Sequence, residues 1–213
     1  MPPLAKHSPA QPPSPVGVIA CAAIARELTA IARYSGIENA FKLHCLPAEL
    51  HNTPQLITGR IREKLDELSD QYEQLFVAYA DCGTGGQLDS LLEERGVTRL
   101  PGAHCYEFFA GNQDFEALME QELGTFFLTD FLVRHFKRLF VASLGLDRYP
   151  QLKEQYFAHY KRLVYLAQTD DQELRQQAEE QAAWLGLEFE YRFTGYDHLH
   201  KALDDKRVLQ WQN

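Results

Sequence analysis

The feature that most constrains the fold of this chain is a repeated alternation between short apolar runs and longer stretches with helical spacing. The apolar runs lie at residues 16–21, 41–45, 75–80 and 162–167, and the stretches with helical spacing at 22–34, 53–72, 87–95 and 171–185. Such alternation indicates a parallel sheet covered by helices on both faces. We therefore predict an α/β fold, a three-layer Rossmann-like parallel sheet with a helical insertion or cap.

The chain divides into two regions by composition. Residues 1–15 are rich in proline and are expected to form a disordered arm. Residues 16–213 are expected to form a single α/β domain. Within it, the stretch at about 108–160 reads as mainly helical and is predicted to be an insertion or cap.

Charge and hydropathy narrow the class of protein. The chain has 30 acidic and 21 basic residues, a net charge of −9, which disfavours binding to nucleic acid or to an anionic membrane. No apolar run approaches the roughly 18 residues of a membrane span, and no basic region precedes the first run as in a signal peptide. We expect a cytoplasmic protein whose four cysteines are free thiols.

The cysteines fall where ligands bind in open α/β sheets, beyond the carboxyl ends of the strands. Cys21 and Cys45 end the first two predicted strands, Cys82 follows the third, and Cys105 lies in the next loop. Because the carboxyl ends of parallel strands share one edge, we expect these residues to gather there. The alternative is that some of them only fill the core, since free cysteine is often buried.

Histidines accompany these cysteines. His44 and His104 directly precede two of them, and His51 follows shortly after Cys45. Thiolate and imidazole together suit zinc or iron, and four thiolates suit zinc or an iron–sulfur cluster. Adjacent residues on a strand point to opposite faces, so some of these histidines would support ligands rather than bind the metal.

Other polar residues extend the predicted site. The loop at 81–86 offers the backbone amides of a glycine-rich turn to an anion, or is simply a tight turn. Cys82 lies near the start of the following helix, where a thiolate is favoured as a ligand or a nucleophile. The candidate catalytic residues are Cys82, Asp81 and Glu107, and the candidate cofactor-binding residues are Gly83, Thr84, Gly85, Gly86, Thr169 and Asp170.

Six strings in the chain resemble a prokaryotic family known as domain of unknown function 1638. They begin at residues 19, 46, 81, 104, 124 and 165: IAC, LPAELHN, DCGTGG, HCYE, GTFFLTD and YLAQTD. Ala22 stands where that family typically has glycine. Members are often encoded beside corrinoid-dependent methyltransferases, so the resemblance implies a setting in one-carbon metabolism and a corrinoid protein or methyltransferase as partner.

Three functions follow from these observations. The first is a metal-binding protein, holding zinc or an iron–sulfur cluster, linked to corrinoid-dependent methyl transfer. The second is a non-enzymatic accessory protein or metallochaperone. The third is a metal-free enzyme with Cys82 as nucleophile and His104 or His44 as base. The sequence does not indicate the substrate or the oligomeric state.

Overall fold

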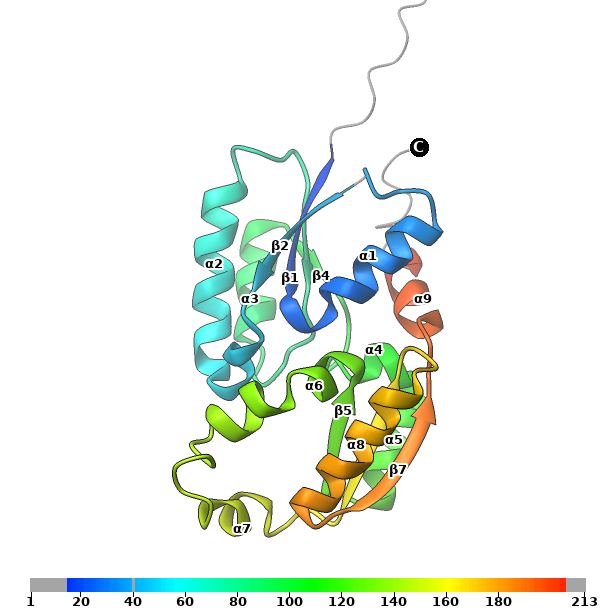
Figure 1. Ribbon diagram of the computed structural model, residues 1–213. Coiled ribbons are helices and arrows are strands. Elements are labelled where there is room, and N and C mark those ends of the chain that lie inside the picture. The colour runs from blue at the N-terminus through cyan, green and yellow to red at the C-terminus, as the bar shows by residue number, and fades with distance from the viewer. Residues whose placement is uncertain (1–14, 40, 206–213) are drawn as a thin grey trace, which may run out of the picture.

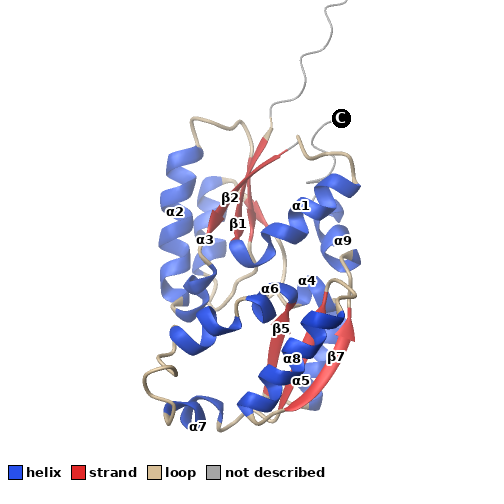
Figure 2. Cartoon of the chain, viewed as in Figure 1, coloured by secondary structure: helices blue, strands red, loops and turns tan. Residues whose placement is uncertain are grey.

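The computed structural model describes residues 15–39 and 41–205, and its strands form two parallel sheets (Figures 1 and 2). The first sheet has the order β2 (Phe41–Leu46), β1 (Val16–Cys21), β3 (Leu75–Ala78) and β4 (Thr98–Arg99). The second has the order β5 (Thr125–Thr129), β6 (Arg162–Ala167) and β7 (Glu188–Phe193). The predicted Rossmann-like α/β class with parallel strands is confirmed. The strands are divided between two sheets, where one was expected.

Helices cover both faces of the first sheet. The pair α2 (Ile57–Leu68) and α3 (Gln87–Arg95) lies on one side, and the pair α1 (Ala25–Tyr34) and α9 (Asp197–Asp205) on the other (Figure 1). The short 3-10 helices η1 (Ala22–Ile24), η2 (Ala48–Asn52) and η3 (Pro54–Leu56) complete this lobe. Every residue of β1 is buried, which explains the continuous apolar run of this strand.

The second sheet has its own helices. They are α4 (Glu107–Ala110), α5 (Asn112–Gln121), α6 (Asp130–Arg134), α7 (Leu152–Phe157), α8 (Gln172–Leu185) and the π-helix η4 (Lys137–Ala142). None of the helices in the described part of the chain has the length and apolar character needed to cross a bilayer.

The stretch expected as a helical insertion, 108–160, also contains a strand. Residues 125–129 form β5, which pairs with β6 and opens the second sheet. The run is short, and helical segments flank it, so helical spacing dominates any longer window of sequence. The stretch therefore builds part of the second lobe. The proline-rich arm expected over 1–15 lies outside the described residues, apart from residue 15.

The carboxyl ends of the two sheets face each other (Figure 1). Helix α6, which directly follows β5, packs against η1, which directly follows β1. Phe127, Phe131 and Leu139 of the second lobe belong to the same buried core cluster as Cys21. Residues that follow strands in either sheet are thus brought together between the lobes.

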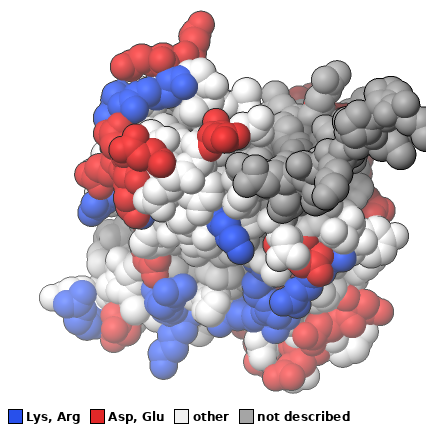
Figure 3. Space-filling model, turned by 90° about the horizontal axis from the view of Figure 1, so that it is seen from above, with Lys and Arg blue, Asp and Glu red and all other residues white. Residues whose placement is uncertain are grey.

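The surface seen from above carries both signs of charge. Acidic and basic side chains lie in small neighbouring groups over this face (Figure 3). Two ion pairs join α2 to α3: Arg95 contacts Asp66 at 2.7 Å, and Arg62 contacts Glu94 at 3.8 Å. These exposed pairs are worth little individually in stability.

Candidate metal site

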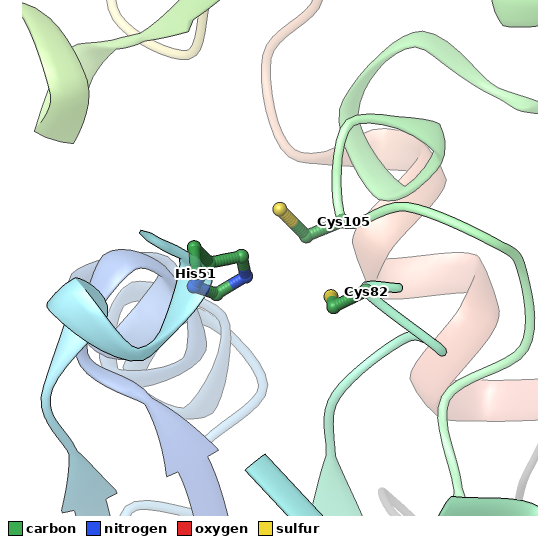
Figure 4. A group of neighbouring side chains, drawn as sticks. All are labelled: His51, Cys82 and Cys105. Carbon is green, nitrogen blue, oxygen red and sulfur yellow. The ribbon is translucent and has the colours of Figure 1, made fainter. Parts of the chain in front are cut away.

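Three of the predicted residues converge at the edge of the first sheet. His51, Cys82 and Cys105 each place one ligand atom so that all three atoms lie within 4.8 Å of one another (Figure 4). His51 comes from η2 after β2, Cys82 from the loop after β3, and Cys105 from the loop after β4. The shared strand edge predicted from the sequence therefore gathers these side chains.

The imidazole of His51 is oriented by the backbone. Its Nδ1 lies 3.1 Å from the carbonyl oxygen of Ala48, to which it donates, and 3.9 Å from the Sγ of Cys21. The other nitrogen, Nε2, is buried and has no hydrogen-bond partner of good geometry among the described residues. One ring nitrogen points toward Cys82 and Cys105 (Figure 4), and since Nδ1 faces Ala48, this nitrogen is Nε2. Histidines that bind metals commonly donate their other N–H to a carbonyl in this way.

The segment that carries His51 is held from the second lobe. The Asn52 side-chain amide donates to the carbonyl oxygen of Leu139 at 3.3 Å and to the Ser143 hydroxyl at 3.0 Å. Arg138 forms an ion pair with Glu49 at 2.9 Å. The π-helix η4 and the residue after it therefore fix η2, and with it the position of His51.

Cys82 has an unusual backbone conformation. Its φ is 51°, in the left-handed region, which costs a residue other than glycine about 1 kcal/mol. Its amide donates to the carbonyl oxygen of Ala103 at 2.8 Å, and the Asp81 amide donates to that of Gly102 at 3.1 Å. These two bonds tie the loop of Cys82 to the loop of Cys105, and so bring the two thiols together.

The three side chains strongly influence one another's ionisation. Interaction with Cys105, and then with His51, lowers the pKa of Cys82 to about 5 despite its burial. The same contact with Cys82, together with burial, raises the pKa of Cys105 well above its usual value. Burial opposes the charged form of His51, but interactions with Cys21 and Cys82 raise its pKa to about 11. The charged forms of Cys82 and His51 therefore stabilise each other.

Two further buried residues line this group. Cys21 is 2% exposed, and its Sγ accepts a hydrogen bond from the amide of Ala23 at 3.4 Å. Tyr79 is 1% exposed, and its hydroxyl lacks a hydrogen-bond partner of good geometry in the part of the chain that the structure describes. The Tyr79 ring stacks on the His51 ring, with centroids 6.3 Å apart and planes 11° apart. Burial, and next the Cys21 thiol, raises the pKa of Tyr79, so its hydroxyl stays protonated.

The sequence did not single out Tyr79. It lies at the end of an apolar run, where an aromatic residue reads as part of the core. Only the unpaired hydroxyl distinguishes it, and that is visible in the structure alone.

Three of the predicted ligands lie elsewhere. Cys45 is an exposed residue of β2 and lies outside the group, and partial burial of its thiol, then the nearby Cys21, raises its pKa. His44 is paired through its Nε2 with the Tyr72 hydroxyl at 2.9 Å. His104 is exposed, and its ring contacts the rings of Tyr106 and Phe115. Since β2 is an edge strand of the first sheet, its side chains reach solvent more readily than those of β1 or β3.

The glycine-rich loop binds its own carboxylate. Asp81 accepts hydrogen bonds from the Thr84 hydroxyl and from the amides of Gly85, at 3.1 Å, and Gly86, at 3.0 Å. These bonds, led by the one from Thr84, lower the pKa of Asp81 although burial opposes the shift. The amides of Gly85 and Gly86, predicted to face an anion, thus already face Asp81, and Gly83 with a φ of 84° shapes the turn.

Glu107 and the two predicted residues after β6 also have internal partners. Glu107 accepts from the amides of Ala103 and His104 at 2.8 and 3.0 Å, which closes the loop before Cys105. Thr169 donates to Asp130 through both its amide, at 3.1 Å, and its hydroxyl. Asp170 is exposed.

A buried carboxylate that sequence reasoning missed organises the second sheet's edge. Asp130 directly follows β5 and is 4% exposed. Besides Thr169, it accepts from the Tyr165 hydroxyl at 2.7 Å and from the Gln168 amide at 3.0 Å. Asp130 lies in the string GTFFLTD, and its partners Tyr165, Gln168 and Thr169 lie in YLAQTD. These two strings are the sequence feature that could have pointed to the network.

Glu27 of α1 is a second buried carboxyl near this network. It is 4% exposed, and its Oε2 has no hydrogen-bond partner within residues 15–39 and 41–205. Burial raises its pKa to about 7, and the nearby charge of Asp130 adds to the shift, whereas Arg26 and Arg134 oppose it. The first lobe therefore places a buried carboxyl close enough to Asp130, at the edge of the second sheet, to feel its charge.

The fold and the site define a two-lobed α/β protein with an imidazole and two thiols at the facing sheet edges. The family model described as "Protein of unknown function (DUF1638)" matches residues 45–203, and the chain belongs to this family. The matched region contains His51, Cys82 and Cys105 and both strings around Asp130, whereas Cys21 precedes it. No curated protein and no solved structure shows a significant match.

Proposed function

We propose that the chain is a metal-binding protein that holds one ion of the zinc class through His51, Cys82 and Cys105. The observation that carries this proposal is the buried, unpartnered Nε2 of His51 beside two thiols, with all three ligand atoms within 4.8 Å. An imidazole and two thiolates are ligands that zinc prefers. The hydrogen bond that Nδ1 donates to the carbonyl oxygen of Ala48 holds the ring so that Nε2 faces the two thiols, as a metal ligand requires.

The spacing favours a single ion over an iron–sulfur cluster. Zinc–sulfur bonds of about 2.3 Å in a tetrahedron place two thiolates roughly 4 Å apart. A cluster distributes its thiolates over several iron atoms, usually with four cysteines. The group has two cysteines in close contact with one histidine, and Cys45 lies outside it. We therefore choose zinc of the two cofactors expected from the sequence.

The ionisable side chains of the site favour the binding of a doubly charged metal ion. A ligating thiol must lose its proton, and the neighbouring Cys105 and His51 side chains favour the thiolate of Cys82. Metal binding would displace the remaining protons from Cys105 and His51. The two thiolates then balance the charge of the ion in a largely buried setting, which limits the electrostatic cost of burying it.

Three protein ligands leave one tetrahedral position for another ligand, as in catalytic zinc sites. Bound zinc would lower the pKa of a thiol or water in that position. We propose that this chemistry serves corrinoid-dependent methyl transfer in the cytoplasm, with a corrinoid protein or methyltransferase as partner. This setting is supported by the family resemblance, and the thiol-activating chemistry of the ligand set is compatible with it.

A metal-free cysteine enzyme is the second candidate function. Its supporting observation is the thiol of Cys82 beside the imidazole of His51, close to the start of α3, where its neighbours favour the thiolate form of Cys82. A thiolate in such a position is a nucleophile. The partner in this mechanism is His51, in place of the His44 or His104 expected from the sequence.

Titration of the metal-free protein with Co²⁺ under anaerobic conditions tests the proposal. We expect a near-ultraviolet thiolate-to-cobalt charge-transfer band that saturates at one ion per chain. Cys105→Ser should weaken this band and the affinity, while the matched Cys45→Ser variant should leave both unchanged. A band that depends on Cys45 as strongly as on Cys105 would contradict the assigned ligands. Absence of any band, with Cys82 alkylated rapidly at pH 6, would favour the cysteine enzyme.

A further inference from the structure

We propose that the Tyr79 hydroxyl is the hydrogen-bond donor for a small external anion that occupies the remaining position on the metal ion. This inference rests on the proposed metal site and names the class of ligand that the site would accept. Tyr79 would then be a residue that contacts the bound ligand.

The first argument is the cost of the unpaired hydroxyl. Tyr79 is 1% exposed, and its buried hydroxyl makes no hydrogen bond of good geometry within the described residues, although the Cys21 thiol lies close enough to interact with it. Leaving such a group unsatisfied costs roughly 1–3 kcal/mol. Phenylalanine would fill the same volume without this cost, so the hydroxyl has no stabilising role in the unliganded protein.

The second argument is where the hydroxyl lies. Tyr79 directly follows β3, three residues before Cys82, and its ring stacks on that of His51. The two rings are nearly parallel, with planes 11° apart and centroids 6.3 Å apart. Tyr79 therefore lies beside the group that would hold the ion, directly after a central strand of the first sheet.

The third argument concerns the chemistry of the ligand. A phenol hydroxyl donates one hydrogen bond, so its partner must offer a lone pair. A thiolate and an inorganic anion such as azide share this property, and each can bind zinc or cobalt. The buried surroundings favour a ligand of few atoms over a large one.

Cys21 is the competing partner within the chain. Its Sγ lies on the Nδ1 side of His51 and accepts a hydrogen bond from Ala23, outside the group of three ligand atoms. Rotation of the Cys21 side chain onto the metal would exclude an external ligand and give the Tyr79 hydroxyl a protein partner. The experiment therefore needs a Cys21→Ala variant.

The test uses the full chain loaded with Co²⁺ and titrated separately with 2-mercaptoethanol and with azide, followed by visible absorption. We compare the wild type with Tyr79→Phe and with Tyr34→Phe, whose ring is 89% exposed. Loss of one hydrogen bond of typical strength predicts that Tyr79→Phe binds at least one probe about fivefold more weakly. The affinity for Co²⁺ should remain the same, and Tyr34→Phe should match the wild type. Binding of the thiol alone, or of azide alone, identifies which kind of anion the site accepts.

A second measurement separates this role from a structural one. In urea unfolding of the metal-free protein, Tyr79→Phe should be at least as stable as the wild type, because it lacks the unpaired hydroxyl. A lower unfolding midpoint, or unchanged affinity for both probes, would overturn the inference. Probe binding that appears only in Cys21→Ala would also overturn it, since Cys21 would then be the fourth ligand. A wild type that binds no Co²⁺ overturns the metal site itself, whereas one that binds Co²⁺ but neither probe overturns this inference alone.

Discussion

Replacing Glu27 with glutamine should remove a pH-dependent loss of stability. Burial raises the pKa of Glu27 from 4.5 to about 7, so the folded state binds this proton more tightly than the unfolded state does. Stability is therefore expected to fall as the pH rises from about 4.5 to about 7, and to remain lower above that range. At about 1.4 kcal/mol per pKa unit, the difference corresponds to about 3 kcal/mol.

The assay is urea unfolding of the wild type and Glu27→Gln between pH 4 and pH 8, with exposed Glu116→Gln as the control. We expect the wild type and Glu27→Gln to have similar free energies of unfolding at pH 4, where Glu27 is protonated in both the folded and the unfolded state. At pH 8, Glu27→Gln should be more stable than the wild type by about 3 kcal/mol. The two proteins share all their other titratable groups, so the contributions of those groups cancel in the difference between the two free energies of unfolding. A Glu27→Gln variant that is equally or less stable at pH 8 would refute the conclusion that this carboxyl is buried without a partner.

Three further predictions concern the two sheet edges. Asp130→Asn should lower the unfolding free energy by about 3 kcal/mol, because an amide cannot accept from all the donors around Asp130; a loss no larger than that of exposed Asp114→Asn would show that the network is dispensable. Cys82→Gly should be about 1 kcal/mol more stable than Cys82→Ala in urea unfolding, since glycine adopts the φ of 51° without strain. Equal stability would argue against the left-handed conformation. In metal-free protein, the pH profile of Cys82 alkylation should have its midpoint at about 5, with that of Cys45 well above it, as mass spectrometry would report; coincident profiles would contradict the thiolate at Cys82.

The α/β class could be predicted because buried parallel strands leave continuous apolar runs in the sequence. Strand β1 and the run that becomes β6 were evident for this reason. The number of sheets could not be predicted, because it depends on β5, five residues long and flanked by helices. Strand pairing is a long-range property, and no local pattern states which strands share a sheet.

The site was predictable to the extent that it follows from strand ends. Cys82 and Cys105 meet because both follow neighbouring strands of one sheet, β3 and β4. His51 was one of three candidate histidines, and only the structure shows that its Nε2 is buried and unpaired. Asp130 and Glu27 were missed because their significance lies in burial between the lobes, which sequence spacing does not reveal.

Metal content of the protein purified without air is the measurement that tests the central claim most directly. Elemental analysis should find about one zinc ion per chain in the wild type and in Cys45→Ser. The His51→Ala variant should retain little, because it loses the nitrogen that completes the set of three ligands. Protein that folds normally but contains no stoichiometric metal, or that retains its metal in His51→Ala, would contradict the account.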